Sequence, residues 1–190
     1  MSFNVLVVPE DPTLNGYILE SLIEPILREC GKPNARIDVL RNPRAKGYEH
    51  AKSLIEGGLL DRYVHMDLIL FLPDADGKDR SPAFEALETQ AAQVGVRLIC
   101  QCAVQEVEVW LLAGHTDKLD RPWQEIRSDT HVKEGGFQPF LARYGDMRQA
   151  GGGRKQLMQE TLSNYNGLLT RCPEIKVLQD RICAAVASST

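Results

Sequence analysis

Short apolar runs alternate with amphipathic stretches over the first hundred residues. Runs expected as buried strands lie at about 3–9, 67–72 and 96–100, and an alternating polar and apolar run at 36–40 predicts a half-buried strand. Apolar residues at three-and-four spacing predict helices between them, at about 19–27, 51–57, 81–94 and 104–113. Parallel neighbours need crossover connections, so this order predicts an α/β fold with a mostly parallel four-stranded sheet flanked by helices.

The periodicity weakens after residue 114. Residues 115–153 show no clear element, whereas 155–165 and 174–186 have helical patterns. We therefore expect a core at 1–114 and a helical extension at 115–190 that packs on it as part of the same domain. Gly151-Gly152-Gly153 is interpreted as a flexible linker; if this segment engages substrate, Lys155 is the expected phosphate contact.

Acidic residues follow two of the predicted strands. Glu10 comes after the run at 3–9, and Asp74 and Asp76 come after the run at 67–72, the third predicted strand in chain order. Because the carboxyl ends of parallel strands meet at one edge of a sheet, these side chains should lie together. Carboxylate oxygens are the ligands that Mg²⁺ prefers, with water or substrate phosphate in the other positions. The pattern predicts a site for Mg²⁺ (or Mn²⁺) and a phosphate-ester substrate.

An acidic residue after the first strand and Asp-x-Asp after the third resemble the Toprim domain of topoisomerases, bacterial primases and OLD-type nucleases. The resemblance covers residues 3 to about 113. It implies that Glu10 serves as a general acid/base or metal ligand. It also implies that Asp74 and Asp76 bind Mg²⁺ for phosphodiester cleavage or formation.

A second segment, Glu108-Val109-Trp110-Leu111-Leu112-Ala113, looks like the Glu-x-Trp-Leu-Leu-Ala segment of small stand-alone Toprim-like proteins. The resemblance makes Glu108 an additional acidic site residue. On a helix, Glu106 and Glu108 would point about 200° apart, so only one of them is expected to face the site. Trp110 is expected to be a packing residue.

Basic residues accompany the acidic ones at the same predicted edge. Lys78 and Arg80 follow the Asp pair, and Arg41, Arg44 and Lys46 follow the second strand. Such a local patch could hold a nucleic-acid backbone and neutralise a scissile phosphate. The alternative interpretation of each residue is an ordinary solvated side chain.

Composition limits the range of partners and locations. The chain of 190 residues has a formal charge of −4 and a pI near 5.6, which excludes a surface that is basic throughout. No apolar run approaches the roughly 18 residues of a membrane-spanning helix. Five cysteines, an odd number, in a sequence that opens without a signal-peptide pattern favour a reducing, cytoplasmic location.

The combined prediction is a Mg²⁺-dependent phosphodiester hydrolase, most simply a nuclease acting on DNA or RNA. Stand-alone Toprim-like proteins often belong to phage-defence or mobile-element systems, which implies an effector working beside an ATPase partner. Glu10 is followed by Asp11, where Toprim first loops usually have glycine. This departure favours an alternative, a degenerate binding module without catalysis. A small-molecule phosphohydrolase or phosphotransferase with the same ligands is the other alternative.

Overall fold

A computed structural model describes residues 2–188 and confirms the predicted α/β architecture. The strands are β1 (Asn4–Val8), β2 (Arg36–Val39), β3 (Leu68–Phe71) and β4 (Leu98–Cys100). They form one parallel sheet in the order β2-β1-β3-β4. The chain runs outward in opposite directions from β1 and β3, so these neighbours flank the topological switch point, where open α/β sheets bind ligands.

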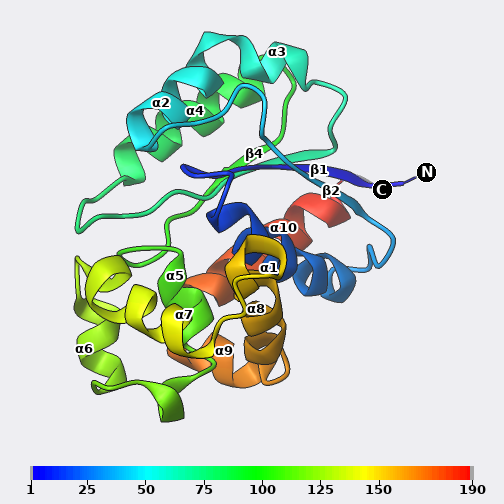
Figure 1. The fold of residues 1–190 in the computed structure, drawn as a ribbon. Coiled ribbons are helices and arrows are strands. Elements are labelled where there is room, and N and C mark those ends of the chain that lie inside the picture. The colour runs from blue at the N-terminus through cyan, green and yellow to red at the C-terminus, as the bar shows by residue number, and fades with distance from the viewer. Residues whose placement is uncertain (1, 189–190) are drawn as a thin grey trace.

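Helices cover both faces of this sheet (Figure 1). The helical elements of the first half are α1 (Asn15–Glu29), α2 (Tyr48–Leu54), η1 (Ile55–Leu59), α3 (Leu60–Arg62), α4 (Ser81–Gln93) and α5 (Glu108–Leu112). Those of the second half are η2 (Thr116–Lys118), α6 (Trp123–Ser128), η3 (Lys133–Phe137), α7 (Gln138–Tyr144), η4 (Ala150–Gly153), α8 (Arg154–Leu162), α9 (Tyr165–Arg171) and α10 (Pro173–Ala187).

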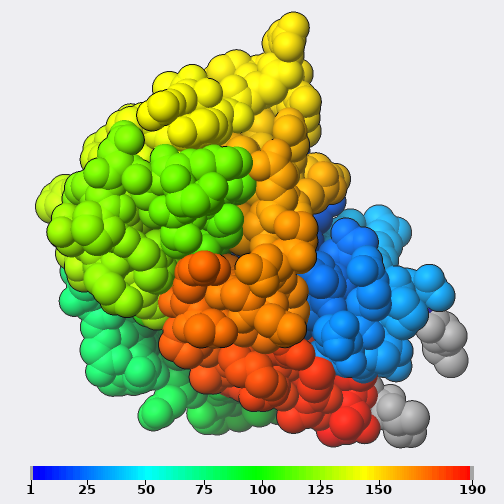
Figure 2. Space-filling view, turned by 90° about the horizontal axis from the view of Figure 1, so that it is seen from below, coloured from blue at the N-terminus to red at the C-terminus, as the bar shows by residue number. Residues whose placement is uncertain are grey.

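Alternation along the strands divides the core between the two faces. Val5 and Val7 of β1 pack with α1, α5 and the C-terminal helices, whereas Leu6 and Val8 pack with α2 and α4. The first cluster runs without a break from β1 to Val186 near the end of α10, so the C-terminal helices share the core of the sheet. Figure 2 shows these later elements covering the lower face beside α1.

One predicted helix start is confirmed and another shifts. Helix α4 begins at Ser81, as expected, and Asp79 Oδ1 accepts the Ser81 N–H at 2.9 Å. Residues 104–107, predicted as helix, form a loop in which Gln105 has a φ of 66°. This loop binds the segment after β3, which delays α5 until Glu108.

The glycine-rich segment is a built turn, and its interpretation as a flexible linker is wrong. Gly151, Gly152 and Gly153 have φ values of 65°, 63° and 86°, which residues with a Cβ rarely adopt. A Cβ on Gly151 would stand 2.5 Å from the Tyr17 ring, and one on Gly153 would stand 2.6 Å from the Asp146 nitrogen. The segment is therefore packed tightly against α1 and the end of α7.

A disulfide joins Cys30, which caps α1, to Cys183 in α10. The sequence pattern did not indicate this pair, because an odd number of cysteines favoured free thiols. Disulfides are typical of oxidising compartments, so the pair argues against the expected reducing environment, and cytoplasmic location stays a prediction. No helix within residues 2–188 has both the length and the apolar character needed to cross a membrane.

Candidate acidic site at the switch point

Glu10 and Asp74 lie in contact beyond the carboxyl ends of β1 and β3. Glu10 Oε1 accepts the backbone N–H of Asp74 at 3.0 Å. The contact follows from the register, since Val8 pairs with Phe71 at the strand ends and Glu10 and Asp74 follow within the next few residues. The prediction that these two residues emerge together is confirmed.

Asp74 also fixes the loop that precedes α5. Its side chain is buried, and its Oδ1 accepts the Val107 N–H at 2.7 Å. The neighbouring N–H groups of Ala75 and Asp76 both donate to the Gln105 carbonyl, at 2.8 and 3.1 Å. Asp74 therefore holds together the segments that follow β3 and β4.

Glu108 is the most deeply buried acid of the site. It is the first residue of α5 and is 0% exposed. Neither of its carboxylate oxygens has a hydrogen-bond partner anywhere in residues 2–188, although the Lys133 ammonium lies 3.4 Å from Oε1 as an ion pair. A buried carboxylate without hydrogen bonds is costly, which makes Glu108 a strong candidate for binding a cation.

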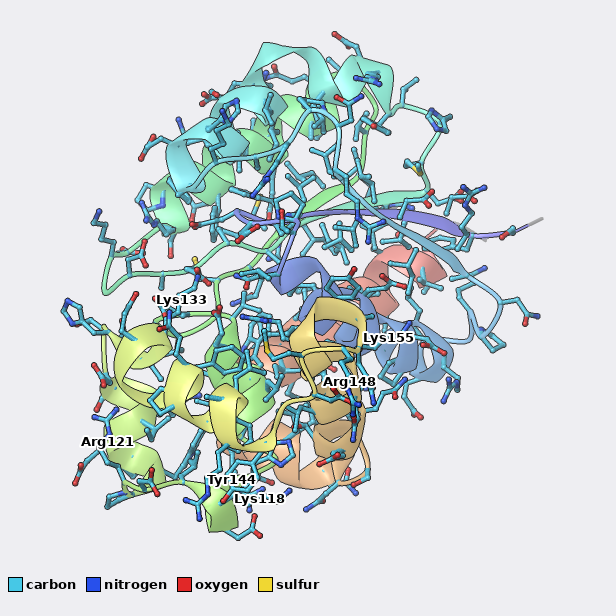
Figure 3. All side chains as sticks on the ribbon, in the orientation of Figure 1. Lys118, Arg121, Lys133, Tyr144, Arg148 and Lys155 are labelled. Atoms are coloured by element: carbon cyan, nitrogen blue, oxygen red, sulfur yellow. A yellow bond between two sulfur atoms is a disulfide. The ribbon has the colours of Figure 1, made fainter. Side chains whose placement is uncertain are left out.

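Glu106 and Lys133 belong to the same cluster, although the sequence pattern predicts neither there. Glu106 precedes α5, so the two glutamates do not share a helix and the expected separation of about 200° does not hold. The Glu106 Oε2 atom is buried without a partner among the described residues. Lys133 comes from η3, in the stretch without periodicity, and lies at the upper end of the extension facing the sheet (Figure 3).

Asp76 takes a different position from its predicted partner Asp74. Its side chain is 46% exposed and pairs with Arg80 at 3.4 Å. Its φ of 51° places it in the left-handed region, opposite Gln105, which is also left-handed. Strained backbone of this kind is concentrated at functional sites. Asp76 therefore lies at the rim of the site, and the structure does not bring it into the buried cluster.

Burial and mutual repulsion favour the protonated carboxyl groups. Burial raises the pKa of Glu10 to about 7. The negative charge of Asp76 also raises this pKa, whereas the hydrogen bond from the Asp74 N–H lowers it. Burial, Glu108 and Glu10 together raise the pKa of Asp74 to about 8. Burial and then Glu108 raise the pKa of Glu106 to about 7, while Lys133 opposes the shift. At neutral pH the cluster therefore carries less negative charge than free carboxylates would.

These shifts predict that stability falls as pH rises. Asp and Glu have pKa values near 4 in the unfolded chain, against about 7 for Glu10 and about 8 for Asp74 in the folded protein. The folded state therefore binds more protons than the unfolded chain between these pKa values. The stabilisation that these two groups contribute is complete below about pH 4 and is lost as pH rises to about 8. In metal-free buffer we expect Tm to fall by about 5–10 °C from pH 5.5 to pH 8.5. Thermal unfolding of wild type and Asp74→Asn checks this, since the variant should show a flatter profile; equal slopes would contradict it.

The predicted basic residues differ in accessibility. Arg80 has a side chain that is 11% exposed, and its guanidinium lies 3.6 Å above the Tyr48 ring. Lys78 and Lys46 are exposed. Arg44 lies 4.0 Å from Asp11 and lines, with Arg41, a pocket of about 190 Å³ beside the first loop. Arg41 and Arg44 therefore lie beside the loop that follows Glu10.

Lys155 and Arg154 are neighbours that differ in burial. Lys155 is exposed, and Figure 3 shows it on α8 well apart from Lys133. Arg154, the residue before it, is buried, and the charge of Glu108 acts on it. Sequence reasoning missed Arg154 because its direction depends on the three left-handed glycines before it.

The carboxylate oxygens of the site are of the type that binds a hard divalent cation, but their side chains do not converge on one point. Within the part of the chain that the structure describes, no three His, Cys, Asp or Glu side chains are grouped closely enough to hold a metal ion. The carboxylate oxygens of Glu108, which accept no hydrogen bond from the described residues, and the desolvated carboxyls of Glu10 and Asp74 are nevertheless the oxygen donors that Mg²⁺ or Mn²⁺ takes.

Trp110 is fully buried and donates to Glu174 at 2.9 Å, which agrees with its predicted packing role.

Comparisons of this chain with protein-family models, with curated proteins and with solved structures give no significant match.

Proposed function

We propose that this protein is a Mg²⁺- or Mn²⁺-dependent phosphodiester hydrolase that acts on nucleic acid, as its resemblance to Toprim nucleases implies. One observation carries the proposal. At the switch point of a parallel sheet, Glu108 is fully buried, neither of its oxygens accepts a hydrogen bond from residues 2–188, and its charge acts on Asp74, which contacts Glu10. A divalent cation would add its positive charge to that of Lys133 in this cluster.

Glu10, Asp74 and Glu108 are the residues that would hold the metal. Glu10 and Glu108 have flexible side chains of two methylene groups, so rotamer changes could bring their carboxylates toward Asp74. When bound, the metal supplies Lewis-acid polarisation of a phosphoryl oxygen and a more acidic water. The loop around Asp76 and Gln105 would set the position of these groups.

The remaining residues have complementary roles. Lys133 carries positive charge into the cluster and would neutralise the negative charge that develops on the phosphoryl oxygens. Glu106, with a pKa of about 7, is suited to accept a proton from the attacking water near neutral pH. Arg80, held on Tyr48 and paired with Asp76, would orient the substrate at the rim.

The exposed cations explain how an acidic chain could hold a polyanion. Lys78 lies on the loop after Asp76, and Arg41, Arg44 and Lys46 lie on the side of β2. A nucleic-acid strand crossing the carboxyl edge of the sheet would meet both groups. DNA or RNA is the proposed substrate, and a phage-defence or mobile-element effector with an ATPase partner is the proposed setting.

Two observations favour the alternative of a binding module without catalysis. Lys133 already neutralises part of the cluster, and the acids are not grouped as an assembled metal site. A binding module would retain affinity for nucleic acid but would respond to neither Mg²⁺ nor Mn²⁺.

Cleavage assays test the proposal. Labelled plasmid DNA, single-stranded DNA and RNA are incubated with Mg²⁺, Mn²⁺ or EDTA, alongside mononucleotide substrates. We expect metal-dependent cutting of at least one polymer, lost in Glu10→Gln and retained in Asp61→Asn, which changes an exposed acid on α3. Turnover of mononucleotides alone would favour a small-molecule phosphohydrolase. Binding without cutting in any metal would favour the binding module.

A further inference from the structure

Arg154 is held in a fixed place by the turn before it. It begins α8, directly after the left-handed Gly153, and is 7% exposed. Its Nη1 donates to the Gly151 carbonyl at 2.8 Å, and its guanidinium lies 5.2 Å from the centre of the Phe137 ring. Because Gly151 packs on Tyr17 and Gly153 on Asp146, this turn cannot relax without disturbing α1 and the end of α7. The guanidinium is therefore preorganised.

One edge of this guanidinium has no partner. Nη1 is used by Gly151, whereas the buried Nε makes no hydrogen bond in the described structure. No carboxylate of residues 2–188 forms an ion pair with Arg154, although the charges of Glu108 and Asp11 act on it. Nε and Nη2 together form the side of arginine that matches two oxygens of a phosphate or carboxylate.

A buried cation with an unused hydrogen-bonding edge is expensive to maintain. Balancing the charge of Glu108 at a distance would account for a positive charge near this position. It would not account for a guanidinium whose Nε is buried and unpaired, because charge balance needs no particular hydrogen-bonding edge. The unpaired edge indicates a ligand with two acceptor oxygens.

We infer that Arg154 binds a phosphate group of the substrate in a bidentate manner through Nε and Nη2. The choice of phosphate over carboxylate as the ligand rests on the proposed function. Glu108 belongs to the candidate metal site, and its charge acts on Arg154. The C-terminal extension thus contributes a substrate-binding residue to a site whose acids come from the α/β core. Arg154 would position the phosphodiester, and Lys133 would approach it from a different element.

Calorimetric titration with inorganic phosphate and with a thymidine dinucleotide, in EDTA, tests this inference without requiring catalysis. We expect Arg154→Gln to weaken binding by about 10- to 100-fold, the effect of losing a charge-assisted bidentate pair. Arg154→Lys should recover less than half of the lost binding free energy, because a point charge lacks the fork. The control is Lys176→Gln, which removes an exposed cation of α10 and should leave the affinity within about twofold. A preference for the dinucleotide would indicate a phosphodiester site, and a preference for phosphate would indicate a terminal phosphate.

A measurement on wild type guards against variants that fail to fold. The Arg154 Nε–H resonance, identified by its absence in Arg154→Lys, should shift on phosphate titration. An unmoved resonance, or equal affinities in wild type and Arg154→Gln, would overturn the inference. Arg154-dependent phosphate binding without metal-dependent cleavage would support the inference and contradict the proposed function. Metal-dependent cleavage without Arg154-dependent phosphate binding would support the proposed function and contradict the inference.

Discussion

Asp74→Asn should make the protein more stable and less active. The asparagine Oδ1 can still accept the Val107 N–H, while the repulsion from Glu10 and Glu108 disappears. We expect Tm at pH 8 in metal-free buffer to rise by about 2–6 °C, equivalent to about 1–2 kcal/mol. Metal-dependent cleavage should fall by at least about 100-fold, since loss of a ligand should cost at least as much as loss of its supporting partners. A stability gain coupled to loss of activity is typical of residues retained for function.

Thermal unfolding and cleavage rates, measured on the same preparations, check this prediction. Asp61→Asn is the control, because it neutralises an exposed carboxylate on α3 and should change neither quantity appreciably. A purely structural Asp74 would give the opposite result in stability, with a lower Tm in the asparagine variant and activity that falls only with the folded fraction.

Removing the Cys30–Cys183 disulfide should produce the largest loss of stability. The bond has a sequence separation of 153 residues, so it strongly restricts the unfolded chain and ties α10 to α1. We expect the Cys30→Ala, Cys183→Ala variant to lose about 2–5 kcal/mol, which corresponds to a fall of about 5–15 °C in Tm. Because Arg181 of α10 donates to the Cys100 carbonyl at the end of β4, early loosening of α10 should also disturb this edge of the sheet.

Reduction provides an internal control for this second prediction. Dithiothreitol should lower Tm in wild type and leave the double variant unchanged. Thiol titration of the unfolded, non-reduced protein should detect three free thiols, those of Cys100, Cys102 and Cys172. Five reactive thiols, or a Tm in wild type that ignores reduction, would show that the bond does not form.

The sequence was sufficient to predict the core of the fold because its strands are short apolar runs with clear ends. Leu68–Phe71 is buried on both faces, so its pattern is continuous, and β1 behaves in the same way. The start of α5 could not be predicted, because it depends on a long-range contact between Asp74 and Val107. The short helices between 115 and 153 carry too few residues for a helical period to emerge.

The candidate site was predictable only where it follows the strands. Glu10 and Asp74 were identified because strand ends place residues by topology, and Glu108 was identified through a resemblance. Lys133 and Arg154 come from the extension, where position is set by glycine turns and packing that no local pattern reveals. The rim position of Asp76 likewise depends on its left-handed backbone and its pair with Arg80.

Calorimetric titration of the metal-free protein with Mg²⁺ and Mn²⁺ at pH 8 tests the central claim most directly. The account predicts saturable binding in wild type, at least tenfold weaker binding in Asp74→Asn and in Glu108→Gln, and unchanged binding in Asp61→Asn. It also predicts that bound metal raises the Tm of wild type. Absence of saturable binding, or equal affinity in wild type and the two site variants, would contradict the assignment of these acids as a divalent-cation site.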